Sequence, residues 1–140
     1  MKSDIPFTTD AELANFIQQF EQCEWPYERW THRAHLAVAV CYLRQYTFTE
    51  ALDRVRFHIQ QYNRICGDPN GYHETITILF MRMVAHRLEQ NPHPDMVDLI
   101  NELHRTCDMQ WLAKYYSPER LWSSTARTEW VEPDREPLDF

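Results

Sequence analysis

The sequence predicts an all-α protein, a single compact up-down bundle of about five to six helices that ends in an extended C-terminal tail. Only two glycines, Gly67 and Gly71, occur in 140 residues, whereas β-rich folds need many tight turns that recruit glycine. The hydrophobic fraction is 44%, with 14% aromatic residues, which is typical of a globular chain with a buried core. We therefore expect one helical domain over residues 1–140, with 131–140 as the tail.

Apolar residues recur at helical spacing between successive start and break signals, and this pattern gives the expected helices. Their expected ranges are 10–22, 31–46, 47–65, the stretch after Gly71 as far as residue 88, 96–107 and 117–130. Asp68 or Asn70 is the expected cap of the fourth helix. The second helix is apolar nearly all round, so we expect it to lie at the centre. Residues 108–116 read either as a continuation of the fifth helix or as a short separate helix after a kink.

Charge and composition exclude several classes of function. The formal net charge is −7, and no run of Lys and Arg is present, so we expect no nucleic-acid partner. No apolar run approaches the ~20 residues of a membrane helix, and the first residues do not resemble a signal peptide. We therefore expect a cytoplasmic protein with no membrane partner. Its four cysteines form no Cys-x-x-Cys pair, so their spacing supports neither disulfides nor a zinc site.

Two histidine-rich stretches stand at helix starts. His32 and His35 open the second expected helix, and His73 with Glu74 opens the fourth. Because helices two, three and four are joined by short connections, they should alternate in direction, and the starts of helices two and four should meet. The two stretches are therefore expected to form one site.

A transition-metal site is the leading hypothesis for these residues. The positive end of the helix dipole disfavours protonated histidine, and neutral imidazole is the form that binds metals. We expect His32, His35 and His73 to hold a divalent transition metal such as Zn, Fe, Cu or Mn, with a position left open for reaction. Glu74 would be a ligand or an acid–base partner, although a glutamate in a first turn usually only satisfies the helix dipole.

A small anionic molecule is the expected substrate, because helix starts favour anions. Tyr116 and Arg120, beside the Ser117-Pro118 helix start, are expected to reach the same end of the bundle and act with Glu74 as catalytic residues, Arg120 as a bidentate anchor. His104 is expected nearby on the descending fifth helix, and whether it joins the site stays open. The sequence leaves open whether the protein is an enzyme. If it is one, an oxidoreductase and a hydrolase are both possible.

Two alternatives remain beside the metal hypothesis. One is a metal-free pocket that binds a small acid through histidine, Tyr116 and Arg120. The other is a helical interaction module whose apolar surface makes a homo-oligomer, which the five tryptophans and the apolar second helix make plausible.

Three blocks of sequence also resemble a known group. They are Trp-Thr-His-x-x-His-Leu at 30–36, Gly-Tyr-His-Glu-Thr-Ile-Thr at 71–77 and Tyr-Tyr-Ser-Pro-Glu-Arg-Leu at 115–121. Together they resemble a family of small, uncharacterised bacterial helical proteins. The resemblance spans most of the chain and implies a helical fold, but it implies no particular activity.

Overall fold

The computed structural model describes residues 2–140, and its regular secondary structure is all helical. Its elements are α1 (Asp10–Glu21), η1 (Tyr27–Arg29), α2 (His32–Gln45), α3 (Phe48–Ile65), α4 (Glu74–Gln90), α5 (Met96–Thr106), η2 (Trp111–Lys114), α6 (Pro118–Leu121) and α7 (Ser124–Thr128). No β-strand occurs within these residues, so the prediction of an all-α bundle is confirmed. Seven of these elements in residues 2–140 are α-helices, one more than the six expected, because the last expected helix is divided in two.

Threonine side chains start the first three long helices. Thr9, Thr31 and Thr47 have extended backbones, and each accepts a hydrogen bond from the backbone N–H three residues further on. Each such cap satisfies a donor that the helix itself leaves unpaired, and typically stabilises the protein by about 1 kcal/mol. The helix starts therefore follow the local signals that the sequence offers.

The second long helix, α2, is the centre of the core. Every residue from Leu36 to Val40 is buried, which covers all sides of the helix. It packs against α1, α3, α4 and α5. The sequence predicted this central place, because a helix that is apolar nearly all round must be covered all round.

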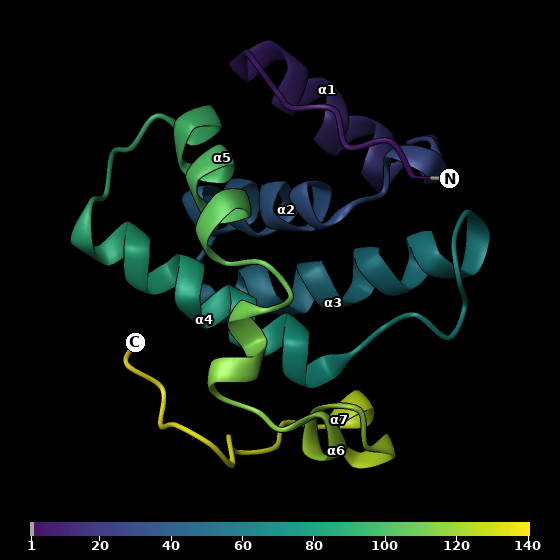
Figure 1. The fold of residues 1–140 in the computed structure, drawn as a ribbon. Helices are drawn as coiled ribbons and strands as arrows, with labels where there is room; N and C mark the ends of the chain where they lie inside the picture. The colour runs from purple at the N-terminus through teal and green to yellow at the C-terminus, as the bar shows by residue number, and fades with distance from the viewer. Residues whose placement is uncertain (1) are drawn as a thin grey trace.

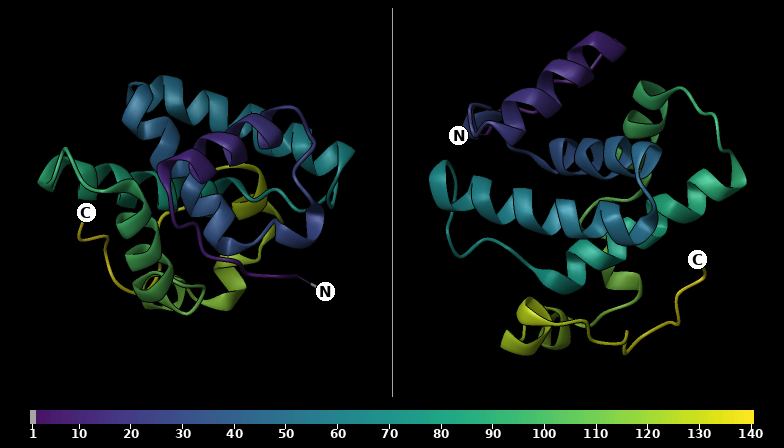
Figure 2. Two further views of the ribbon diagram at one scale, coloured as in Figure 1. Left: turned by 90° about the horizontal axis from the view of Figure 1, so that it is seen from above. Right: turned by 180° about the vertical axis from the view of Figure 1, so that it is seen from behind.

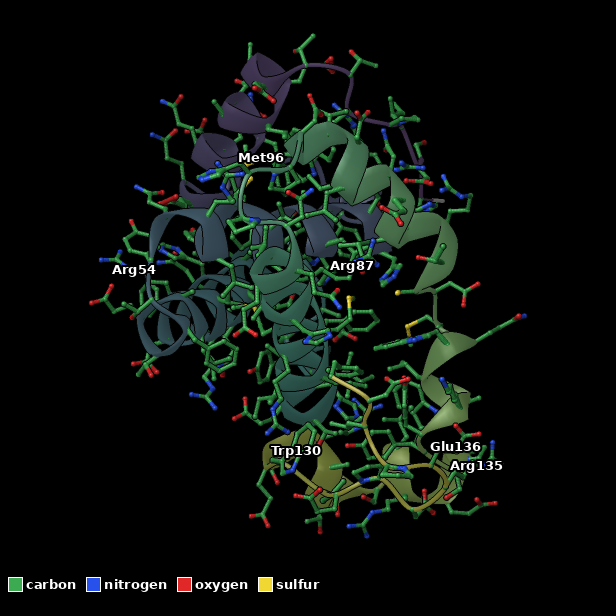
Figure 3. All side chains as sticks on the ribbon, turned by 90° about the vertical axis from the view of Figure 1, so that its left-hand side faces the viewer. Arg54, Arg87, Met96, Trp130, Arg135 and Glu136 are labelled. Atoms are coloured by element: carbon green, nitrogen blue, oxygen red, sulfur yellow. The ribbon has the colours of Figure 1, made fainter. Side chains whose placement is uncertain are left out.

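The directions of the helices bring two of their starts to the same side of the molecule. In Figure 1, α2 and α3 run in opposite directions, and α4 turns back again after the loop 66–73. The fifth helix does not continue the alternation but crosses in front of α2, and the view from behind in Figure 2 agrees. An ion pair of 2.7 Å between Arg87 and Glu102 joins α4 to α5, and Figure 3 shows Arg87 between them.

The C-terminal part differs from one continuous helix over 117–130. The hydroxyl of Ser123 accepts from the N–H of Ala126 and so starts a new helix, α7, immediately after α6. Residues 108–116 do not continue α5. They contain a short separate element, η2, which was one of the two expected alternatives. The tail 131–140 has no helix, as expected, and it is attached by buried Thr75, whose hydroxyl donates to Glu129 O and accepts from Val131 N–H.

No helix among residues 2–140 combines the length and the apolar character that crossing a membrane requires.

Candidate functional site

A cavity of about 740 Å³ lies where the starts of α2 and α4 meet. This size is within the usual range of small-molecule pockets, roughly 300 to 1,000 Å³. Its walls are largely apolar and aromatic, and they come from the three helices α2, α3 and α4, the loop 66–73 and the α6–α7 segment. The apolar part of the wall consists of Trp30, Leu36, Ala39, Val55, Ile59, Ile76, Phe80, Met81, Met109 and Trp122.

The three histidines named from the sequence all line this cavity. His32 and His35 come from the first turn of α2, and His73 directly precedes α4. The short connection from α2 to α3 and the loop 66–73 produce this meeting, because they reverse the chain twice. The two histidine-rich stretches therefore share one site.

The His35 ring is oriented by its own helix and by Trp30. Its Nδ1 lies 2.8 Å from the carbonyl oxygen of Thr31, so Nδ1 carries the proton and donates. The ring centroids of His35 and Trp30 are 3.9 Å apart. His35 is exposed to solvent through the open cavity, yet many protein atoms lie around its imidazole, and the resulting desolvation lowers the pKa of His35 to about 4. Its Nε2 has no protein partner among residues 2–140 and offers a lone pair.

The His32 ring is held in the opposite tautomer. Its Nε2 donates to the carbonyl oxygen of Cys107 at 2.8 Å, which ties the start of α2 to the end of α5. Burial lowers the pKa of His32 below its ordinary value. Its Nδ1 is without a hydrogen-bond partner in the described residues. Each of these two histidines is thus neutral and has one ring nitrogen left as an acceptor.

The third histidine, His73, forms hydrogen bonds through both of its ring nitrogens. Its Nδ1 accepts a hydrogen bond from the N–H of Ile76 at 3.1 Å, and its Nε2 lies 2.6 Å from the carbonyl oxygen of Leu121, to which it donates. His73 is therefore the N-cap of α4, and the expectation that Asp68 or Asn70 caps this helix is wrong. The side chain is 6% exposed, and this burial lowers the pKa of His73.

These contacts bear directly on the metal hypothesis. A ring nitrogen that binds a metal needs a free lone pair, and both nitrogens of His73 are engaged. His32 and His35 remain as the two histidines with a lone pair to offer. Among residues 2–140, no group of three or more His, Cys, Asp or Glu side chains is placed to hold a metal ion. The three-histidine arrangement does not fit these side-chain positions, and the metal site stays a prediction from the sequence.

Glu74 does not line the cavity but forms an ion pair with Arg56. Its two carboxylate oxygens accept from Nε and Nη2 of Arg56 on α3, at 3.1 and 2.7 Å. The hydroxyl of Tyr72 donates to the same carboxylate at 2.5 Å. Glu74 is absent from the cavity lining, whereas Tyr72 contributes to it. This bidentate pair joins the start of α4 to α3, so Glu74 has a clear structural role.

Tyr116 and Arg120 also lie away from the cavity. The buried hydroxyl of Tyr116 donates to the carbonyl oxygen of Val131 at 2.7 Å, and Nε of Arg120 donates to that of Glu132. Both side chains therefore hold the C-terminal tail. His104 is likewise engaged elsewhere, because its Nε2 lies 3.1 Å from the Asp4 carboxylate.

The arginine of the cavity is Arg127, which the sequence did not single out. It is exposed, and its guanidinium carbon lies 5.6 Å from the ring centroid of Trp122, itself 47% exposed. Both residues line the cavity. No carboxylate among residues 2–140 forms an ion pair with Arg127. Arg127 lies in α7, which starts after the break at Ser123, whereas the sequence predicted one continuous helix over 117–130.

Asn63 is a second residue that sequence reasoning missed. It is 6% exposed and lines the cavity, and its Oδ1 accepts a hydrogen bond from the Trp30 indole at 3.3 Å. A signal was available, because Asn63 falls beside Tyr62 on the apolar stripe of α3. A polar side chain on a buried stripe normally has a specific partner.

Comparisons with protein-family models, curated proteins and solved structures gave no match to this chain, so the family resemblance suggested by the three sequence blocks stays a prediction.

Proposed function

We propose that this protein binds a small, partly apolar organic anion in the cavity between α2 and α4, without a metal. The observation that carries the proposal is that two neutral imidazoles, each with one unpaired ring nitrogen, line the same apolar, aromatic cavity of about 740 Å³. A large apolar pocket with a few convergent polar groups is the usual form of a small-molecule site.

The chemistry of the lining defines the ligand class. Nδ1 of His32 and Nε2 of His35 are acceptors, so the ligand should present O–H or N–H donors to them. Arg127 supplies an unpaired positive charge at the exposed edge, where it suits a carboxylate, sulfonate or phosphate group. The aromatic wall, which includes Trp30 and Phe80, suits a flat apolar body.

The protonation states favour binding over acid–base catalysis. Burial keeps both His32 and His35 neutral at neutral pH, and the pKa of His35 is about 4. A base with so low a pKa removes protons weakly near pH 7, because general bases work best when their pKa lies near the working pH. Glu74, the acid–base candidate, is occupied by Arg56 and Tyr72.

Calorimetric titration with 1-anilinonaphthalene-8-sulfonate tests this proposal. The probe is an aromatic anion with an N–H donor, and so it has each feature expected of the ligand. Arg127→Gln should weaken binding about tenfold, as expected for the loss of a charge-assisted contact. His35→Phe should also weaken binding, because it removes an acceptor while keeping a ring.

The matched control is Arg82→Gln. Arg82 is also exposed and also lies over a tryptophan, with its guanidinium carbon 5.0 Å from the Trp130 ring, but it does not line the cavity. Its removal should leave the affinity unchanged. Equal affinity of the wild-type protein, Arg127→Gln and His35→Phe for the probe would overturn the proposal.

A metal-dependent site is the second candidate function. It is supported by the two unpaired ring nitrogens of His32 and His35, three residues apart on one helix. An ion there would polarise a substrate oxygen or activate water. A three-histidine site would additionally require His73 to give up its contacts with Leu121 and Ile76.

Elemental analysis of protein purified without an affinity tag separates the two candidates. The metal-dependent site predicts bound metal, or a rise in the thermal midpoint with Zn, Fe, Cu, Mn or Ni, which His32→Ala abolishes. The metal-free pocket predicts no effect of any of these ions on stability or on binding of the probe.

A further inference from the structure

Two cysteines that lie far apart in the sequence meet where α1 and α3 end. The thiol of Cys66, the residue that follows α3, donates a hydrogen bond to the carbonyl oxygen of Cys23 at 2.9 Å. Both cysteines are partly exposed and reduced. The pKa of the Cys23 thiol is raised, first by burial and next by the neighbouring Cys66.

The backbone at Cys23 makes its presence there unusual. Its φ is 58°, the sole positive φ at a non-glycine position in residues 2–140. Its N–H bonds to the carbonyl oxygen of Phe20, and the N–H of Glu24 bonds to that of Gln19, which is the Schellman ending of a helix. Glycine is strongly favoured at this position, because a Cβ is strained in the left-handed region. A cysteine here thus sits in an unfavourable conformation directly beside a second cysteine.

The two helix ends are fastened to each other around this pair. The hydroxyl of Tyr62 donates to the carbonyl oxygen of Trp25 at 2.7 Å. Gly67 lies so close to the Tyr27 ring that a Cβ there would be 3.1 Å from a ring carbon. These contacts on both sides of the pair hold the segments 23–27 and 62–67 together and keep the Cys66 thiol beside Cys23.

We propose that Cys23 and Cys66 form a reversible disulfide by exchange with a small-molecule disulfide such as oxidised glutathione. One cysteine, as its thiolate, attacks a sulfur atom of the reagent, forms a mixed disulfide and releases one thiolate. The other cysteine then attacks the protein sulfur of that mixed disulfide and releases the second thiolate. The two protons of the protein thiols end on the two released thiols, so the protein is oxidised by two electrons and the reagent is reduced by two.

The bond would act on the wall of the cavity. Cys66 is followed by the loop 67–73, and the residues Asp68, Asn70, Gly71, Tyr72 and His73 of this loop line the cavity. A disulfide at Cys66 anchors the beginning of that loop to the end of α1. The pairing does not depend on what the cavity binds, so it can be tested independently of the proposed ligand.

Peptide mapping of the native full-length protein tests the pairing. The protein is incubated with oxidised glutathione, its remaining thiols are alkylated, and the digest is analysed without reduction. We expect a peptide pair joined through Cys23 and Cys66, two hydrogen atoms lighter than the reduced pair and separated by dithiothreitol. Because the bond closes a long loop of the unfolded chain, the thermal midpoint of the oxidised protein should rise by about 5 °C or more.

Matched variants complete the experiment. Cys23→Ser and Cys66→Ser should each abolish the cross-linked pair and stop at the mixed disulfide with glutathione. Cys41→Ser is the control, because Cys41 is also partly exposed, but burial raises the pKa of its thiol to about 12. It should leave the Cys23–Cys66 pair intact. A map with no such pair, or one in which Cys23 or Cys66 pairs with Cys41 or Cys107 instead, overturns the proposal.

Discussion

His73 Nε2 lies 2.6 Å from the carbonyl oxygen of Leu121, and this hydrogen bond ties the start of α4 to the end of α6. The same ring caps α4, because its Nδ1 accepts a hydrogen bond from the N–H of Ile76. One imidazole therefore binds both the start of α4 and a residue 48 positions further along the sequence. This double use holds the α6–α7 segment, which carries Trp122 and Arg127, against the cavity.

Replacing His73 by Ala should lower the free energy of unfolding by about 2–4 kcal/mol. About 1 kcal/mol comes from the lost cap, and about 1–3 kcal/mol comes from the buried carbonyl of Leu121 that is left unpaired. Urea denaturation of His73→Ala at neutral pH measures this change. His93→Ala, at an exposed histidine in the loop after α4, is the control and should be neutral within about 0.5 kcal/mol.

A metal role for His73 makes a different prediction for the same variant. The stability loss expected from hydrogen bonding is equally large with and without a chelator. A loss that disappears when EDTA is present in both samples would instead show that metal binding stabilises the wild-type protein.

The protein should become less stable as the pH falls below neutrality. Burial places the pKa of His35 at about 4 in the folded state, below the ordinary value of 6.5, and it also lowers the pKa of His32 and His73. Between these values the unfolded chain binds more protons than the folded chain, so stability decreases as pH falls through the window from about 6.5 to about 4. The urea midpoint, measured from about pH 7 to about pH 5, should decline steadily.

His35→Phe tests which group is responsible. This variant keeps an aromatic ring against Trp30, whose ring centroid lies 3.9 Å from that of His35, but it cannot be protonated. Its urea midpoint should depend less steeply on pH than that of the wild-type protein. An unchanged slope would show that protonation of His35 is not coupled to unfolding.

The ion pair between Arg56 and Glu74 should stabilise the protein without taking part in ligand binding. The Glu74 side chain is 15% exposed, and its loss leaves Arg56 and Tyr72 without their common partner. We expect Glu74→Ala to cost about 1–3 kcal/mol in urea denaturation, since the partly buried charge of Arg56 then keeps only the exposed Asp53 carboxylate, 3.4 Å away, as its counter-charge. The affinity for the anilinonaphthalene probe should change little.

Asp53→Ala is the matched control for this pair. Asp53 also contacts Arg56, at 3.4 Å, but its side chain is 70% exposed. Exposed ion pairs contribute little, so this variant should cost at most about 0.5 kcal/mol. If Glu74→Ala instead leaves stability unchanged and abolishes probe binding, the carboxylate acts in the site, as the sequence suggested.

The sequence alone was sufficient for the fold class and for the meeting of the two histidine-rich stretches. Threonine caps and apolar stripes are local signals, and two short connections determine which helix starts meet. What each side chain does in the site depends on tertiary partners that no local pattern reveals. His73 and Glu74 stand next to each other, yet His73 binds Leu121 on α6 and Glu74 binds Arg56 on α3.

The arginines illustrate the same limit. Arg120 and Arg127 were expected on one continuous helix, where neither position is distinguished by spacing. The cap at Ser123 breaks this helix, after which Arg120 holds the tail through Glu132 and Arg127 faces the cavity. The two arginines therefore have different partners, although spacing along the sequence does not distinguish them.

Asp4 should anchor the N-terminal segment to the core. Its carboxylate accepts from Nε and Nη2 of Arg33 at 3.0 and 3.2 Å, and it lies 3.1 Å from Nε2 of His104. Arg33 is 9% exposed, so its charge has little access to water. Its other hydrogen-bond partners, Oδ1 of Asn101 and Nδ1 of His104, carry no negative charge. Asp4→Ala should therefore cost about 1–3 kcal/mol, because it leaves a buried guanidinium without its counter-charge.

Hydrogen exchange and urea denaturation together check this prediction. In Asp4→Ala the N–H of Ser3, which bonds to the carbonyl oxygen of Glu28 at 2.6 Å, should exchange faster, because the segment is released from Arg33. Glu24→Ala removes an exposed carboxylate that forms no ion pair within residues 2–140, and it should leave both measurements unchanged. Unaltered exchange at Ser3 in Asp4→Ala would mean that Lys2, through its hydrogen bond to the Trp30 carbonyl, holds the segment by itself.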